Sequence, residues 1–104
     1  MVEQRILDDV VARIVDVAEP EKIILFGSAA RGDTGPNSDL DLLVIKDGVD
    51  ELDLMARIYR RLYGTGAAVD VIVVSPADVE RFKDSHALVI KPALREGMVV
   101  YDGT

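Results

Sequence analysis

Three aspartates are the residues of this chain best suited to chemistry, because they lie in or beside stretches that are otherwise apolar. Asp39 and Asp41 are two positions apart at the start of one such stretch, and Asp70 interrupts another. Side chains two positions apart on a β-strand leave the same face, with Cα atoms about 6.5 Å apart, so Asp39 and Asp41 can reach one ion. Mg²⁺ prefers oxygen ligands and shares its coordination shell between carboxylates and substrate phosphates. The three residues predict a magnesium site, with Asp70 as donor to the same ion or to a second one about 3.5 to 4 Å away.

A purely structural explanation of these aspartates is also open. Under it, Asp39 is a turn residue after Asn37 and Ser38, and Asp70 is solvated on an edge strand. Unpaired carboxylates inside apolar strands are costly without a cation, which favours the metal site over this explanation.

The segment Gly27–Thr34 (GSAARGDT) carries groups that can bind phosphate. Its spacing is superficially that of a P-loop, but Asp33 stands where the P-loop lysine would hold the phosphates, so a P-loop NTPase is excluded. Because Gly27 has no side chain, the backbone can approach a triphosphate there, and the Ser28 hydroxyl and the following N–H groups can bind its oxygens. Arg31 either adds a positive charge to this site or is an ordinary surface residue.

The hydrophobic pattern predicts a complete alternation of helices and strands around these residues. We expect the first helix to stop before Pro20 and the last to kink or restart at Pro92, because proline disrupts helical hydrogen bonding. The predicted helices cover residues 3–18, 49–63, 76–84 and 86–96, and the predicted strands cover 22–26, 40–45, 69–74 and 98–101, the last of them at a sheet edge.

The connections between the predicted strands fix their directions. Strands 40–45 and 69–74 are joined through a helix, which favours a parallel pair, and strands 22–26 and 40–45 are joined by a short segment, which favours an antiparallel pair. The end of the first strand then lies beside the starts of the other two. Gly27, Ser28 and the three aspartates Asp39, Asp41 and Asp70 are therefore expected to converge on one edge of the sheet.

Composition limits what the chain can do. Its 104 residues are expected to form one domain over 1–104, and 12 Lys and Arg against 19 Asp and Glu give a net charge of -7. An acidic surface repels phosphate backbones, so nucleic acid is disfavoured as the main partner. The absence of cysteine excludes disulfides and cysteine-bound zinc, and His86 alone cannot build a histidine metal site. No apolar run approaches the ~20 residues of a membrane span and no signal-peptide pattern is present, so we expect a cytoplasmic location without a membrane partner.

The segment Leu25–Ile45 (LFGSAARGDTGPNSDLDLLVI) resembles the nucleotidyltransferase superfamily of DNA polymerase beta type. The pattern of that superfamily is Gly-Ser, a spacer with Arg-Gly, Asp-x-Asp, and an aspartate on a later strand. The chain looks like the minimal nucleotidyltransferases, or MNT proteins, which are often antitoxin partners of helical HEPN toxins. The resemblance covers Lys22–Ser75 and, more weakly, the tail Leu94–Tyr101. It implies an α+β nucleotidyltransferase fold, with a small mixed β-sheet flanked by helices.

The resemblance also implies an activity. Gly27 and Ser28 would bind the triphosphate of ATP, and Asp39 and Asp41 would bind Mg²⁺. Asp70 would help to hold a second metal ion or act as the base. The implied reaction transfers AMP from ATP onto a hydroxyl, with a tyrosine of a HEPN partner as the acceptor that the family suggests, and releases pyrophosphate.

Two competing functions remain to be weighed. The chain could be an antitoxin that neutralises its partner by contact alone, because its acidic charge would suit a basic surface. The complete set of three aspartates argues against this, since a binding module does not need them. A phosphatase of the haloacid-dehalogenase type also uses Asp-x-Asp, but there the pair follows a strand, whereas Asp39 and Asp41 begin one.

Overall fold

The computed structural model describes residues 4–27, 40–82 and 90–103. Within them the predicted alternation of elements is confirmed, and the first three strands along the chain have the predicted bounds. The elements in chain order are α1 (Gln4–Ala18), β1 (Lys22–Phe26), β2 (Leu40–Ile45), α3 (Glu51–Leu62), β3 (Val69–Val74), α4 (Pro76–Phe82), α5 (Ile90–Glu96) and β4 (Met98–Asp102).

Local signals explain where several helices begin and end. The chain leaves α1 through Glu19, whose φ of 45° lies in the left-handed region, just before Pro20. The carboxylate of Asp50 caps α3 by accepting a hydrogen bond of 3.0 Å from the backbone N–H of Asp53. The described part of the last predicted helix runs from Ile90 to Glu96 and contains Pro92.

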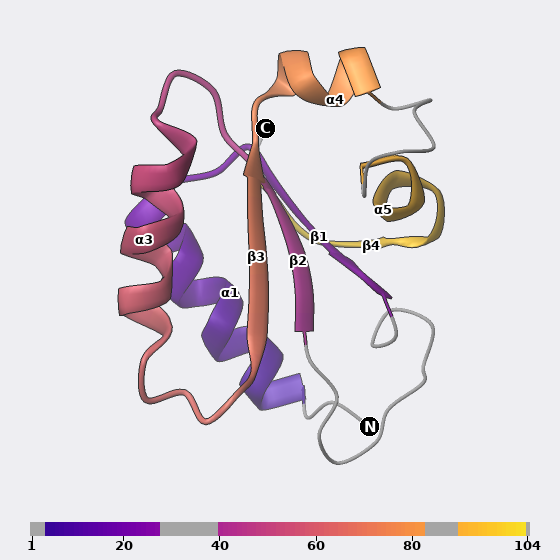
Figure 1. The fold of residues 1–104 in the computed structure, drawn as a ribbon. Helices are drawn as coiled ribbons and strands as arrows, with labels where there is room; N and C mark the ends of the chain where they lie inside the picture. Colours follow the sequence, from indigo (N-terminus) through magenta and orange to yellow (C-terminus); the bar gives the residue numbers. More distant parts are fainter. Residues whose placement is uncertain (1–3, 28–39, 83–89, 104) are drawn as a thin grey trace.

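The four strands form one mixed sheet in the order β3-β2-β1-β4. As predicted, β1 is antiparallel to β2 and β2 is parallel to β3. β4 pairs antiparallel with β1 and closes the other edge, also as predicted. Figure 1 shows α1 and α3 on one face of this sheet and α4 and α5 on the other. The fold is therefore α+β, a small mixed sheet flanked by helices.

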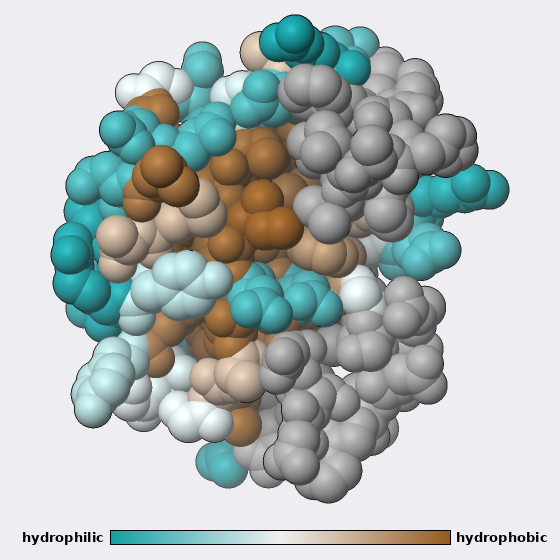
Figure 2. All heavy atoms as spheres, viewed as in Figure 1, coloured by the Kyte–Doolittle hydropathy of each residue, from teal (hydrophilic) through white to brown (hydrophobic). Residues whose placement is uncertain are grey.

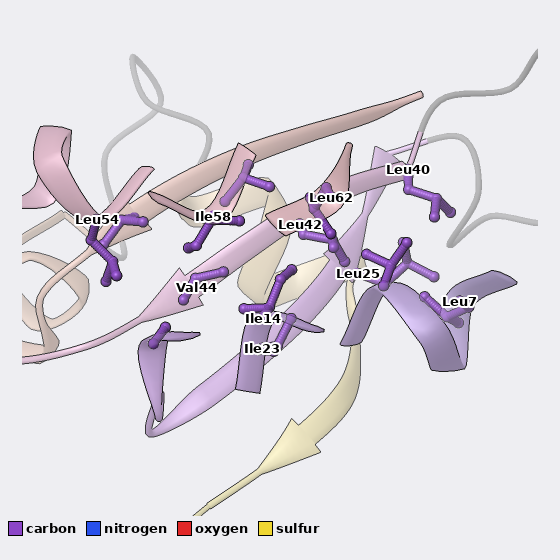
Figure 3. Close-up of a cluster of buried hydrophobic side chains, with 14 residues drawn as sticks. Leu7, Ile14, Ile23, Leu25, Leu40, Leu42, Val44, Leu54, Ile58 and Leu62 are labelled. Atoms are coloured by element: carbon purple, nitrogen blue, oxygen red, sulfur yellow. The ribbon is translucent and has the colours of Figure 1, made fainter. Parts of the chain in front are cut away.

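Each face of the sheet has its own apolar cluster. On the side of α1 and α3, the labelled side chains of Ile14, Ile23 and Leu42 point toward one another from α1, β1 and β2 (Figure 3), and all three are fully buried. On the side of α4 and α5, a smaller cluster forms around Leu43 and Ala93. β2 contributes to both clusters, so its position in the sheet is fixed from two sides. No helix among the described residues is long and apolar enough to cross a membrane.

Candidate active site

Asp41 and Asp70 lie side by side at the starts of two parallel strands. They are register partners between β2 and β3, so their Cα atoms are about one strand spacing, roughly 4.8 Å, apart. Their side chains leave the sheet on the same face as Leu43 and Ile72, the face that carries α4 and α5. The predicted convergence of the two aspartates at one end of the sheet is confirmed.

The two carboxylates differ in exposure. Asp41 is half-buried on the inner strand, whereas Asp70 is exposed, because β3 is an edge strand and Asp70 is its second residue. The expectation of acids buried in apolar strands is therefore wrong for Asp70, which is solvated on an edge strand as the structural explanation of this residue expects. The argument from the cost of burial does not apply to it. Its exposure leaves Asp70 accessible to a molecule arriving from solvent.

Gly27 lies directly against the carboxylate of Asp41. Phe26, the last residue of β1, is the register partner of Asp41, and Gly27 follows with φ of 73°. A Cβ atom on Gly27 would lie 2.2 Å from Oδ2 and 3.1 Å from Cγ of Asp41, which is far inside van der Waals contact. The sequence explains this glycine by the approach of a triphosphate to the backbone. The structure adds a different reason, since the space of the missing side chain is occupied by the Asp41 carboxylate.

Phe26, Asp41 and Asp70 form a row across three strands that sequence reasoning did not assemble as a whole. Phe26 is half-buried at the end of β1, on the same face as the two aspartates. The only sequence signal for it is its position immediately before Gly27. Figure 2 shows apolar surface at the sheet beside the hydrophilic outer side of α3. A molecule bound at this row would meet the two carboxylates and the half-buried side chain of Phe26.

The donor set of this row fits a hard divalent cation. Two carboxylates on adjacent strands and one face are the kind of oxygen donors that Mg²⁺ takes from proteins, with the rest of its shell left to water and phosphate. Over residues 4–27, 40–82 and 90–103, no group of three acidic or histidine side chains is close enough to hold a metal by itself. The remaining predicted site residues, Ser28, Arg31 and Asp39, lie outside the described residues.

A second pair of carboxyl groups lies at the opposite end of β3. Glu51 at the start of α3 shares a hydrogen bond with Asp78 of α4. Burial, this hydrogen bond and the negative charges of Asp78 and Asp50 raise the pKa of Glu51 above its ordinary value. Three hydrogen bonds lower the pKa of Asp78. The largest effect comes from the backbone N–H of Ser75, and smaller ones come from Glu51 and from the Ser75 hydroxyl. The pair links α3 to α4 and is separate from the row of Asp41 and Asp70.

Comparison with a family of known proteins matches almost the whole chain. The family described as polymerase beta, nucleotidyltransferase, matches residues 10–103, a range that includes Gly27, Asp41 and Asp70. No curated protein matches the chain in sequence.

Several solved structures share the fold. A candidate nucleotidyltransferase from Sulfolobus solfataricus is 22% identical, with a TM-score of 0.63 over 94% of this chain and 78% of that one. A toxin-antitoxin structure with AMP-PNP is 16% identical, with a TM-score of 0.66 over 91% of this chain and 73% of that one. A toxin-antitoxin MntA-HpeT mutant, in which two aspartates two positions apart are replaced by glutamate, is 13% identical, with a TM-score of 0.66 over 91% of this chain and 71% of that one. At these identities the likeness establishes a common fold.

Proposed function

The chain belongs to the polymerase beta nucleotidyltransferase family, and we propose that it transfers AMP from ATP onto a protein hydroxyl in a Mg²⁺-dependent reaction. The observation that carries this proposal is the row of Asp41 and Asp70 with Gly27 against it. Two neighbouring carboxylates repel a triphosphate unless a cation lies between them, so this arrangement suits a nucleotide that arrives with its metal.

The residues of the candidate site have distinct roles in the proposed reaction. Asp41 and Asp39 would bind Mg²⁺, and Asp70 is the third carboxylate, which would act as the general base or help to hold a second ion. When bound, the metal neutralises negative charge on the triphosphate and orients it. Gly27 leaves the space that the Asp41 carboxylate occupies, because a Cβ atom at this position would collide with it. Ser28 and Arg31 bind the oxygens of the departing pyrophosphate.

The transfer step is a displacement at the α-phosphorus of ATP. The acceptor oxygen forms a new bond to this phosphorus while the bond to the oxygen bridging the α- and β-phosphorus breaks, and pyrophosphate leaves with that electron pair. The hydroxyl proton passes to the exposed carboxylate of Asp70, which acts as general base in this step. The product is a phosphodiester between AMP and the acceptor.

The proposed acceptor is a tyrosine of a small helical partner of HEPN type, and the chain is then the antitoxin of a toxin-antitoxin pair. Two proteins that share its fold are toxin-antitoxin components, and one was solved with AMP-PNP, an analogue of ATP. A cytoplasmic location, where ATP and Mg²⁺ are present, goes with this proposal.

Intact mass of the partner tests the proposal. The chain is co-expressed with a candidate partner, a small helical protein sought in the neighbouring reading frames. The two are separated under denaturing conditions, and the partner is weighed. We expect the mass of one or more AMP groups on the partner from the wild-type pair, and none with the Asp39→Ala and Asp41→Ala double variant.

The same experiment decides between catalysis and contact. The net charge of -7 would also suit an antitoxin that only covers a basic toxin surface. In that case the partner carries no added mass and the double variant still neutralises it. That result would replace the transferase by the binding module.

A further inference from the structure

α1 has apolar side chains beside the stripe that is buried in the core. One stripe of the helix, with Leu7, Val10 and Ile14, is buried in the core. A neighbouring stripe at spacings of three and four residues includes Val11 and Val15, which are half-buried and pack only at the margin of that core. A surface helix that covers one sheet needs one such stripe, so the second stripe is available to another element.

The second stripe forms one wall of a hollow between α1 and β4. The hollow has a volume of about 430 Å³, and Tyr101 of β4 is the wall that faces α1. The residues from α1 follow one another along the helix and are Asp8, Val11, Ala12, Val15 and Asp16. Its centre is thus aliphatic, and carboxylates stand at both ends, about 12 Å apart along the helix axis.

The hollow exists because two helices cover a face of four strands. α3 packs on β3, and α1 packs beside α3 with its buried side chains among those of β1 and β2. β4, at the other edge, keeps Met98 half-exposed on this face, where it is the register partner of Leu25. A further helix beside α1 and over β4 would complete the layer at the usual spacing of 8 to 10 Å between packed helices.

The charges around the hollow indicate which kind of helix would bind there. Asp16 already pairs with Arg61 of α3. Asp8 accepts a hydrogen bond of 2.8 Å from the neutral amide of Gln4, and no cation among the described residues pairs with it. The whole chain carries a net charge of -7, which disfavours a second copy of itself as the occupant. A basic amphipathic helix would meet both the aliphatic centre and the free carboxylate.

An added strand fits this edge less well than a helix. The pairing of β4 with β1 shifts register between Ile23 and Ile24, where β4 has one extra residue. Such a bulge twists an edge strand and hinders pairing with another strand. The hollow between α1 and β4 is therefore better suited to a helix that lies along α1.

We propose that this groove, lined by Val11, Ala12, Val15 and Tyr101 with Asp8 and Asp16 at its ends, binds a basic amphipathic helix of the partner protein. The inference deepens the proposed function, on which the identity of the partner as a helical toxin rests. The N-terminal end of α1 and the starts of β2 and β3 lie toward the same end of the molecule (Figure 1). A helix seated in the groove would therefore have one end near the row of Asp41 and Asp70.

A designed peptide tests the groove directly. The probe is a helix-forming peptide of about 16 residues with leucines one helical turn apart and lysines at both ends of that apolar stripe. We follow its binding to the ¹⁵N-labelled chain by amide chemical shifts. Shifts concentrated on α1 and β4, with a scrambled peptide silent, are the expected result. No shifts, or shifts centred on other elements, would overturn the proposal.

Two pairs of matched variants sharpen this test. Ala12→Arg fills the groove from an exposed position and should weaken peptide binding at least about tenfold, whereas Ala56→Arg, exposed on α3, should not change it. Asp8→Lys should weaken binding about threefold, whereas Asp9→Lys makes the same charge change one residue away, outside the groove, and should have little effect. Equal effects within each pair would show that the groove does not bind the peptide.

Two further measurements separate this inference from its alternatives. Sedimentation of the chain alone tests a second copy as the occupant, and a dimer that Ala12→Arg dissociates would overturn the proposal. Binding of ATP with Mg²⁺ is measured on the same samples. If the wild type binds ATP with Mg²⁺ but not the peptide, only the docking groove is contradicted. If the wild type binds the peptide but not ATP, only the transferase proposal is contradicted.

Discussion

Gly27 and Asp41 depend on each other for their positions. The glycine leaves β1 with a φ that L side chains rarely adopt, and the carboxylate of its neighbour on β2 occupies the space where a side chain would be. A residue required for conformation and a residue proposed for metal binding are thus in contact. Substitution at one should change the chemistry of the other.

Gly27→Ala should abolish Mg²⁺-dependent ATP binding while costing only about 1 to 2 kcal/mol in the free energy of unfolding, because the new methyl group displaces the Asp41 carboxylate and the left-handed φ is strained. Gly48→Ala is the matched control, since Gly48 has φ of 72° and nothing within 4 Å of the new Cβ. Denaturant unfolding and calorimetric titration measure both quantities. If both variants bind ATP equally well, Gly27 does not position the carboxylate.

Glu51→Gln should stabilise the protein at neutral pH. Burial and the charges of Asp78 and Asp50 raise the pKa of Glu51 above 4.5 in the folded state, so ionised Glu51 is disfavoured there. The favourable contribution of protonated Glu51 to the free energy of unfolding is complete below pH 4.5. It is lost as pH rises through the higher pKa that Glu51 has in the folded state. Glutamine is neutral at every pH. It therefore keeps a hydrogen-bond donor to Asp78 and does not lose this contribution as pH rises.

Melting curves from pH 4 to pH 7.5 measure this effect. The melting temperature of Glu51→Gln should match that of the wild type near pH 4 and exceed it by about one or two degrees at neutral pH, a small rise because the site is near the surface. Asp53→Asn is the control, since it removes an ion pair with Arg57 and should lower the melting temperature at neutral pH. A lower melting temperature for Glu51→Gln at pH 7 would contradict this account of the pair.

The two edges of the sheet are protected differently. At β3, the hydroxyl of Tyr59 accepts a hydrogen bond of 2.8 Å from the backbone N–H of Val71 and lies 3.5 Å from its carbonyl oxygen. A side chain of α3 therefore hydrogen-bonds to backbone groups that are otherwise unpaired at an edge strand. This limits pairing of β3 with other strands. β4 is protected instead by the register shift in its pairing with β1, which hinders the addition of another strand.

Tyr59→Phe should lower the free energy of unfolding by about 1 kcal/mol, because the N–H of Val71 loses its partner at a half-buried position. The amide of Val71 should also exchange faster with solvent. Tyr63→Phe, whose ring is 89% exposed, is the control and should change neither. Unchanged exchange at Val71 in Tyr59→Phe would mean that the hydroxyl does not protect this edge.

The sequence predicted the elements better than the contacts between them. The runs Lys22–Phe26, Leu40–Ile45 and Val69–Val74 are apolar enough to be recognised as strands, and their connecting lengths fix which pairs are parallel. The sequence left the exposure of Asp70 open between two explanations, because the exposure depends on which strand lies at the sheet edge. The contact between Gly27 and Asp41 could not be predicted either, since it joins two strands in a register that only the fold defines.

At the scale of the whole molecule, the two faces of the sheet serve different proposed functions. The row of Asp41 and Asp70 opens on the face with α4 and α5, and the groove beside α1 opens on the other. A partner bound in the groove would leave the face of the carboxylates open to ATP. The net charge of -7 favours a basic partner and makes nucleotide binding depend on a cation.

Calorimetric titration of ATP in Mg²⁺ and in chelator, with wild type and Asp41→Asn, tests the central claim most directly. We expect the wild type to bind ATP only with Mg²⁺, and saturating Mg²⁺ and ATP to raise its melting temperature. Asp41→Asn should stay folded and lose this binding, whereas Asp9→Asn, a distant surface control, should keep it. Equal affinity in Mg²⁺ and in chelator, or unchanged binding in Asp41→Asn, would contradict the assignment of this row as a metal and nucleotide site.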